Sequence, residues 1–211
     1  MDCKHGNEDA VACRDCAADA LVEGGEVLAD FRSARASAYC DTKFPRRFLE
    51  AKADHPGVTE WVDAYLMDPT DARSLLIAGP TGVGKTWQAY GALRAAVCTA
   101  TAPKWEATTF ADFTAALRPG AKDPEAALQT FRSTHLLLVD DLGAAKNSEW
   151  VEEITYRLLN GRYEDVRPSI FTTNLPLPDL REKLGDRLAS RLVEMCAVVP
   201  MEGSDRRRAA A

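Results

Sequence analysis

The octapeptide GPTGVGKT at residues 79–86 is the feature that most limits how this chain can fold. It matches the pattern G-x-x-x-x-G-K-[ST] without deviation, directly after the apolar run SLLIA and before a helix-like segment from residue 85 to about 97. Between a strand and a helix, its glycines let backbone N–H groups surround phosphates, and the helix N-terminus adds partial positive charge. The sequence therefore predicts an α/β domain with a nucleotide-binding loop.

Some residues of this loop are expected to contact the phosphates of the nucleotide, and others the metal ion. Lys85 is predicted to reach the β- and γ-phosphates of ATP, and the Thr86 hydroxyl to bind Mg²⁺. The residues expected to contact the nucleotide are Gly79, Pro80, Thr81, Gly82, Val83, Gly84, Lys85, Thr86 and Trp87.

Polar residues end two further apolar runs. In LLLVDDLG, Asp140 ends a strand of the kind buried on both faces, where its carboxylate can hold Mg²⁺ through water. Asp141 is placed to orient or deprotonate the attacking water. Asn174 ends SIFTTN, and in a parallel sheet its amide would lie near the γ-phosphate. Taken alone, an Asn after a strand is a turn residue; its position relative to the other two motifs favours a role in positioning water.

The order of the remaining segments indicates a doubly wound parallel sheet with sites at the carboxyl ends of its strands. The patterns predict a helix from residue 58 and, after the P-loop helix, helices at 110–117, 124–132 and 150–165, with two short ones before the last strand. Strands are predicted at 74–78, 103–108, 136–140, 169–174 and 197–201.

Two arginines in GDRLASRL, Arg187 and Arg191, lie one helical turn apart on one face of a predicted helix. One interpretation is a surface pair. The other is an arginine finger that enters the ATP site of a neighbouring subunit and stabilises transition-state charge. In the second case full activity requires a homo-oligomer.

Composition limits the classes of partner. The net charge of −6 argues against coating long nucleic acids by charge alone, although local basic clusters at 46–47 and 206–208 leave room for a short grip on phosphates. Those clusters equally fit a solvated surface and a tail. No apolar run approaches the roughly 20 residues of a membrane span, and the polar N-terminus is unlike a signal peptide. We therefore expect a cytoplasmic protein without a membrane partner.

The six cysteines fall into two groups. Cys3, His5, Cys13 and Cys16 form C-x-H-x7-C-x2-C, whose ligand types and number suit a structural Zn²⁺; free thiols with a surface His are the alternative. The others are expected to be small core residues or free thiols: Cys40, Cys98 and Cys196.

From residue 79 to 207 the chain resembles the DnaC-like helicase loaders of bacteria and phages, which are AAA+ relatives of the initiator DnaA. The resemblance rests on GPTGVGKT, DDLG, RYE, TTN, LGDRLASRL and EGSDRR in that order. It implies an AAA+ core, Asp140 as the metal-site acid and Asn174 as the sensor asparagine. It also implies Arg191, with Arg187 as second candidate, as the arginine finger.

The resemblance also extends to the stretch after DDLG, which includes Ser148 and Trp150 and matches a region that the family uses to touch single-stranded DNA. Trp150 could stack on a base or pack against the sheet. Arg207 aligns with an arginine that closes the family's final motif, and its role stays open. Most AAA+ enzymes have Glu at the position of Asp141, so the shorter side chain points to slow hydrolysis. No lid domain is expected after residue 208.

These observations predict an N-terminal helicase-binding module with its linker at 1–56 and an AAA+ ATPase domain at 57–211. The expected function is ATP-dependent loading of the replicative helicase, with single-stranded DNA as a second partner. The alternatives are an IstB-like transposition helper, a nucleotide-gated adaptor with negligible turnover, and, less well supported by the motifs, a small-molecule kinase.

Overall fold

The computed structural model describes residues 25, 30, 32–99, 101, 103–144, 148–203 and 205. The chain divides into two compact units, one formed by Met1–Phe44 with Val97–Ala102 and the other by Pro45–Ala96 with Pro103–Ala211. The boundary predicted at residue 56 stays a prediction, because most of the N-terminal segment lies outside the described residues.

In the first unit, a helix runs over residues 32–43, and the N–H of Phe44 donates to the carbonyl of Cys40 as the helix ends. The thiol of Cys40 is fully buried and lies 3.5 Å from the thiol of Cys98. Neither cysteine is in a disulfide, and the same holds for the buried Cys196 of the second unit. The prediction of small core residues or free thiols is confirmed for these three.

The second unit is built on a five-stranded parallel sheet with the strand order β2-β3-β4-β1-β5. The prediction of a parallel sheet is confirmed, and the observed strands agree with the predicted ones to within two residues at each end. The strands are β1 (Ser74–Ala78), β2 (Trp105–Thr109), β3 (Leu136–Asp140), β4 (Ser169–Thr173) and β5 (Cys196–Pro200).

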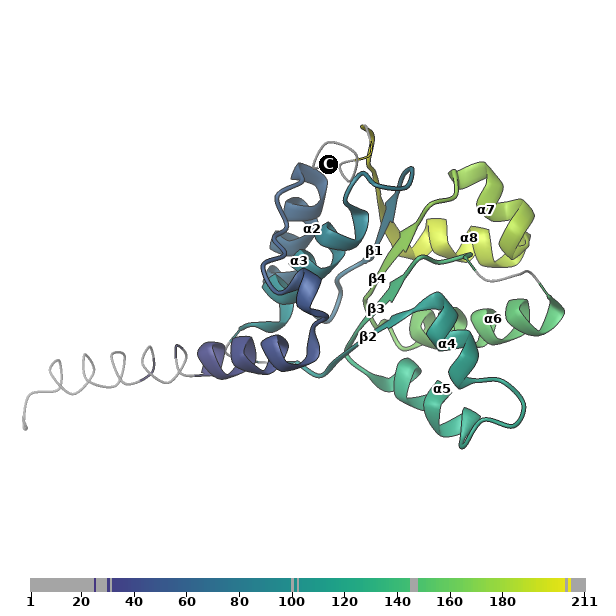
Figure 1. Ribbon diagram of the computed structural model, residues 1–211, viewed down its shortest axis with the longest axis horizontal. Helices are drawn as coiled ribbons and strands as arrows, with labels where there is room; N and C mark the ends of the chain where they lie inside the picture. The colour runs from purple at the N-terminus through teal and green to yellow at the C-terminus, as the bar shows by residue number, and fades with distance from the viewer. Residues whose placement is uncertain are drawn as a thin grey trace, which may run out of the picture. The chain divides into compact units, whose positions relative to one another are not determined.

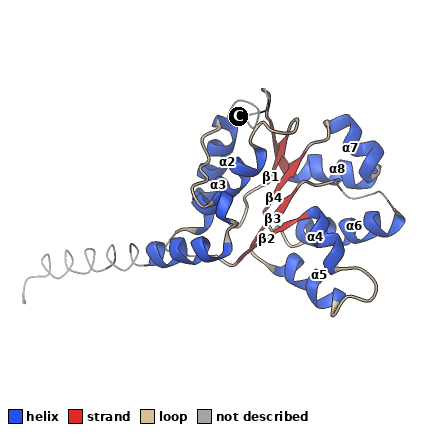
Figure 2. Ribbon diagram, viewed as in Figure 1, coloured by secondary structure: helices blue, strands red, loops and turns tan. Residues whose placement is uncertain are grey.

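Helices cover both faces of this sheet, with α2 and α3 on one face and α4 to α8 on the other (Figures 1 and 2). A short 3-10 helix, η1 (Arg46–Phe48), precedes them. The helices are α2 (Pro56–Met67), α3 (Lys85–Val97), α4 (Phe110–Ala116), α5 (Pro124–Ser133), α6 (Glu149–Glu164), α7 (Leu177–Leu184) and α8 (Asp186–Met195).

The three central strands are buried along their whole length because helices cover both sides of the sheet. Every residue of β1, β3 and β4 is buried, whereas the edge strand β2 is partly exposed. Alternate side chains such as Leu76, Val139 and Phe171 point into one core cluster with the helices α4 to α8. This packing fixes the strands that carry the polar residues discussed below.

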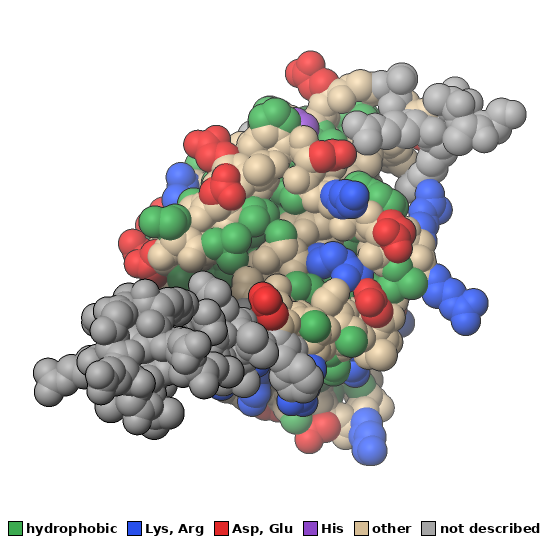
Figure 3. Space-filling view, turned by 90° about the vertical axis from the view of Figure 1, so that its left-hand side faces the viewer, with side chains coloured by type: hydrophobic (Ala, Val, Ile, Leu, Met, Phe, Trp, Pro, Cys, Tyr) green, Lys and Arg blue, Asp and Glu red, His purple; other side chains and the backbone are tan. Residues whose placement is uncertain are grey.

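Charged side chains are interspersed with apolar ones on the face of the molecule seen in Figure 3, where basic and acidic groups alternate over short distances. Among the described residues, no helix has both the length and the apolar character needed to cross a bilayer.

Candidate nucleotide site

The sheet order places the predicted site residues together. Strands β3, β4 and β1 are neighbours, and all three run in the same direction, so their carboxyl ends meet at one edge. The P-loop follows β1, Asp140 and Asp141 lie at the end of β3, and Asn174 follows β4. Three segments that are distant in sequence thus contribute to one site.

The P-loop takes a backbone conformation that needs glycine. Gly82 and Gly84 have φ of 90° and 102°, values that favour a residue without a β-carbon. A β-carbon at Gly79 would lie 2.1 Å from the carbonyl oxygen of Met201, and one at Gly82 would lie 2.0 Å from Oδ1 of Asp205. The segment after β5 therefore lies directly against the loop, a contact that the sequence patterns did not indicate.

Lys85 is buried, and its amino group lies within the site. Nζ donates to the carbonyl of Pro80 at 2.8 Å and to Oδ1 of Asn174 at 2.6 Å. The amide nitrogen of Asn174 donates in turn to Oδ1 of Asp141 at 3.0 Å. The predicted cation, sensor amide and second carboxylate therefore form one hydrogen-bonded chain.

The Thr86 hydroxyl and the Asp140 carboxylate converge at the start of α3. Thr86 Oγ1 lies 3.0 Å from Oδ1 and 3.2 Å from Oδ2 of Asp140. Burial raises the pKa of Asp140, and the charge of Asp141 adds to the rise, while hydrogen bonds from Thr172 and Thr86 and the charge of Lys85 oppose it. A hydroxyl and a carboxylate at this spacing provide the oxygen ligands that Mg²⁺ prefers.

A cavity of about 630 Å³ opens beside this cluster, within the size range of small-molecule sites. Sequence reasoning missed two of its lining residues, Arg47 and Phe48 of η1, although it noted the basic pair at 46–47. The ring of Phe48 stacks on that of Tyr90 in α3, with centroids 4.6 Å apart and an interplanar angle of 7°. The cavity is lined by Arg47, Phe48, Thr81, Gly82, Gly84, Lys85, Thr86, Trp87, Asp140, Asp141 and Asn174.

The two predicted arginines of α8 do not line this cavity. The guanidinium of Arg191 lies 4.0 Å above the ring of Tyr163 and donates to Glu194 at 3.4 Å and to Asn160 at 3.3 Å. Arg187 is exposed. Within one chain, therefore, neither arginine joins the P-loop cluster.

Ser148 and Trp150 lie at the start of α6, beside a second cavity of about 550 Å³ that Arg118 also lines. The Ser148 hydroxyl caps the helix by accepting the N–H of Val151 at 3.2 Å. Trp150 is partly buried and packs against the main core cluster. The structure therefore agrees with the packing of Trp150, and stacking on a base stays a prediction.

Several predicted residues lie outside the described part of the chain: Cys3, His5, Cys13, Cys16 and Arg207. The zinc site stays a prediction, and the role of Arg207 stays open. Over the described residues, no group of three or more His, Cys, Asp or Glu side chains is arranged to hold a metal ion.

A parallel sheet with this loop and these strand ends is the fold of the AAA+ class of P-loop ATP-binding proteins. The IstB-like ATP binding protein family matches residues 61–210, which is more than half of the chain. The chain belongs to this family.

Known relatives agree with this assignment. The replicative helicase loader DnaI of Bacillus subtilis (strain 168) is 25% identical over 168 residues, which cover 71% of this chain and 52% of that protein. The chain thus spans about half the length of this curated relative. The resemblance to DnaC-like loaders expected from the motifs is confirmed.

Solved structures show the shared fold. The DnaC helicase loader superposes with a TM-score of 0.64 at 23% identity, covering 75% of this chain and all of that one. The structure of DnaI superposes with a TM-score of 0.66 at 18% identity, covering 78% of this chain and 94% of that one. AMPPCP-bound DnaA from Aquifex aeolicus gives 0.62 at 22% identity, covering 78% of this chain and 53% of that one.

Proposed function

We propose that this protein is an ATP-dependent loader of the replicative DNA helicase. The observation that carries the ATP part is the hydrogen-bonded chain from Lys85 through Asn174 to Asp141 at the P-loop. Support for the loading part comes from the similarity to a replicative helicase loader. The nucleotide would control the partner, and slow hydrolysis would release it.

The groups already in contact suggest how ATP would bind. The N–H groups of the P-loop and the amino group of Lys85 would hold the β- and γ-phosphates. Thr86 and Asp140 fit Mg²⁺, because their oxygens already lie 3.0 Å apart and are the hard ligands this ion selects. When bound there, Mg²⁺ would neutralise phosphate charge. Asp141 would orient the attacking water, with the Asn174 amide fixing the carboxylate.

Arg47 and Phe48 extend the cavity beyond the phosphate region. We propose that they contact the base or ribose of the nucleotide. The flat face of Phe48 is already paired with Tyr90, which holds the ring at the cavity wall.

The absence of Arg187 and Arg191 from the cavity of their own chain supports an oligomeric site. Arg191 would act on ATP held by a neighbouring subunit, with Arg187 as the second candidate. Mixing Lys85→Ala with Arg191→Ala protein tests this, because mixed assemblies contain sites with an intact P-loop and an intact arginine. ATPase activity that returns on mixing is expected, and activity that stays absent would argue against a shared site. Lys85→Ala mixed with itself is the control.

The remaining partners are proposed from position and resemblance. The cavity beside Ser148 and Trp150, with Arg118 at its wall, would contact single-stranded DNA through stacking and charge. The N-terminal module would hold the helicase. Its fold would be stabilised by a zinc ion bound to Cys3, His5, Cys13 and Cys16.

The direct test of the ATP site is Lys85→Ala, which should abolish ATP binding measured by titration with a fluorescent ATP analogue. Unchanged affinity would refute the site. Asp54→Asn is the control, because Asp54 does not line the cavity and asparagine keeps the oxygen that accepts from Gln88.

The family match also favours a second function, that of an IstB-like helper of a transposase. The ATP site does not separate the two, since both would use the same core. Affinity capture with the full chain and ATP separates them: a replicative helicase supports the loader, and a transposase supports the helper. Single-turnover hydrolysis with DNA and the captured partner then tests the third possibility, an adaptor without turnover.

A further inference from the structure

Thr172 of β4 lies between the two acidic residues of the nucleotide site. Its side chain is fully buried, and its hydroxyl donates to Oδ1 of Asp140 at 2.5 Å. The same oxygen accepts the backbone N–H of Asp141 at 2.8 Å. The hydroxyl of Thr172 thus donates one hydrogen bond to the last residue of β3 and accepts one from the residue that follows it.

The first of these bonds sets the orientation of the Asp140 carboxylate. Oδ1 accepts from both Thr172 and Thr86, while the bond to Oδ2 comes from Thr86 at 3.2 Å. The bond from Thr172 restricts rotation of the carboxylate. Both of its oxygens therefore stay within 3.2 Å of the Thr86 hydroxyl, where the metal ligands would be needed.

The second bond holds an unfavourable backbone conformation. Asp141 has φ of 57°, in the left-handed region that costs energy for residues other than glycine. Its N–H is fixed by the Thr172 hydroxyl, and the next N–H, that of Leu142, donates to the Thr172 carbonyl at 2.7 Å. This turn aims the Asp141 carboxylate at the amide of Asn174, 3.0 Å away.

We propose that Thr172 is a positioning residue that orients Asp140 toward Mg²⁺ and Asp141 toward the attacking water. This role rests on the proposed ATP site. Thr172 itself does not line the cavity, so it acts through the two carboxylates and makes no contact with the nucleotide. Thr172 is the first residue of the TTN motif, but the motif alone does not reveal this role, because β-branched threonine is common in strands.

The test compares Thr172→Val, Thr172→Ser and wild type. Valine keeps the shape but removes the hydroxyl, and serine restores it. Binding of a fluorescent ATP analogue is titrated in EDTA and again across a range of Mg²⁺ concentrations. Thr172→Val should raise the half-saturating Mg²⁺ concentration about 10- to 100-fold, the usual effect of removing a group that orients a metal ligand. Affinity in EDTA should stay near that of wild type, and serine should restore the Mg²⁺ dependence.

Thr155→Val is the matched control. Its side chain is also buried, but its hydroxyl donates to the carbonyl of Val151 within α6 and to no residue of the nucleotide site. The inference is wrong if Thr172→Val binds with the Mg²⁺ dependence of wild type, or if it loses affinity equally with and without Mg²⁺. Wild type that binds no ATP analogue at all would overturn the proposed function as well.

Discussion

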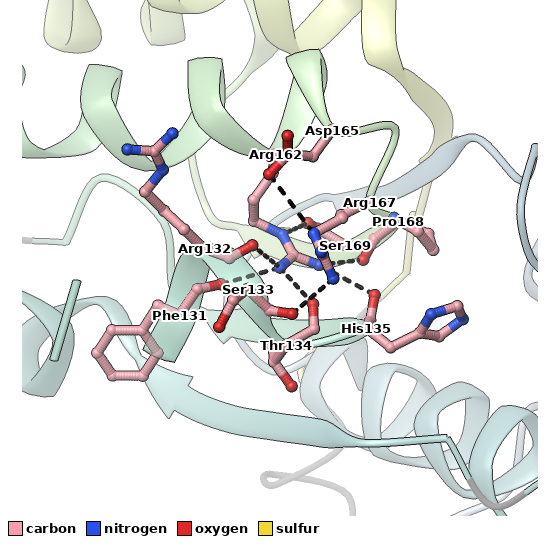
Figure 4. Close-up of polar contacts among 10 residues, drawn as sticks. All are labelled: Phe131, Arg132, Ser133, Thr134, His135, Arg162, Asp165, Arg167, Pro168 and Ser169. Carbon is pink, nitrogen blue, oxygen red and sulfur yellow. Dashed lines mark hydrogen bonds and ion pairs between the residues drawn. The ribbon is translucent and has the colours of Figure 1, made fainter. Parts of the chain in front are cut away.

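The guanidinium of Arg162 in α6 donates from Nε to the hydroxyl of Ser169, the first residue of β4, at 2.7 Å (Figure 4). Arg162 is fully buried, although arginine is rarely found so deep in a protein. Its other nitrogens donate to the backbone carbonyls of Phe131, Arg132, Thr134, His135 and Pro168. Burial lowers the pKa of Arg162 to about 9, so it stays protonated at neutral pH.

This side chain joins the end of α5 to the starts of β3 and β4. Replacing Arg162 with Met would keep much of the volume but leave several buried carbonyls without a donor. We expect the free energy of unfolding to fall by about 3–5 kcal/mol, measured by denaturant titration. Arg157→Met is the control, because its ion pair with Glu125 is exposed and should change stability by less than about 1 kcal/mol. Similar losses in both variants would contradict this role.

Replacing either of two helical glycines with alanine should change the stability of the protein, in opposite directions for the two positions. A β-carbon at Gly91 would lie 2.2 Å from the carbonyl carbon of Lys52 and 2.4 Å from the nitrogen of Ala53, both backbone atoms. At Gly161 the obstacle is the mobile end of the Arg132 side chain. Gly91→Ala should therefore lower stability by about 1–3 kcal/mol. Gly161→Ala should raise it by up to about 1 kcal/mol through helix propensity. Thermal and denaturant unfolding of both variants check this, and a stabilised Gly91→Ala would refute the close crossing.

His135 should make stability depend on pH. Burial lowers its pKa, and the positive charges of Arg167 and Arg162 lower it further. The unfolded chain therefore takes up this proton first as the pH falls. Stability should decline from about pH 7.5 through the ordinary histidine range near 6.5 and level off below the folded pKa.

His135→Phe removes the titrating group while retaining a ring beside Tyr65, whose centroid lies 6.4 Å away. The stability of wild type relative to His135→Phe should fall as the pH drops from about 7.5 through 6.5, and should be constant above that range. A difference that stays constant with pH would mean that His135 does not titrate differently on folding.

Asp141→Asn should separate binding from hydrolysis. Asparagine tolerates the positive φ of this position and still fits beside Asn174, but it cannot take a proton from water. ATP affinity should stay close to wild type, while the hydrolysis rate of the assembled protein should fall about 10²- to 10⁴-fold. Quenched single-turnover measurements with DNA present test this. Undiminished hydrolysis would assign the base to another group.

The sequence predicted the sheet well because its central strands are buried on both faces. SLLIA and LLLVD are nearly continuous apolar runs, and SIFTT adds small buried Ser and Thr side chains to an apolar centre; strands buried in this way are covered by helices on each side. The edge strand β2, with WEATT half-exposed, was weaker in the pattern and was predicted two residues early at its start. Its beginning is set by pairing of Trp105 with Leu136, which local patterns do not contain.

The site residues that belong to sequence motifs could be predicted. Those whose role depends on how strands pair or helices pack could not. Lys85, Thr86, Asp140, Asp141 and Asn174 follow from strand ends in a parallel sheet. The role of Thr172 requires knowing that β4 pairs with β3 through Val139 and Phe171, which brings its hydroxyl beside the next residues of β3. The contacts of Arg191 with Tyr163 and Asn160 depend likewise on how α8 packs on α6.

The beginning of the P-loop is held from both sides. The N–H of Gly79 donates to the Thr173 carbonyl of β4 at 3.2 Å, and the N–H of Met201 donates to the Ala78 carbonyl at 2.7 Å. The entropy lost in ordering this part of the loop is therefore incurred when the protein folds, and not when a nucleotide arrives. Such preorganisation means that association should proceed without a slow isomerisation, and that differences in nucleotide affinity should arise mainly in the dissociation rate.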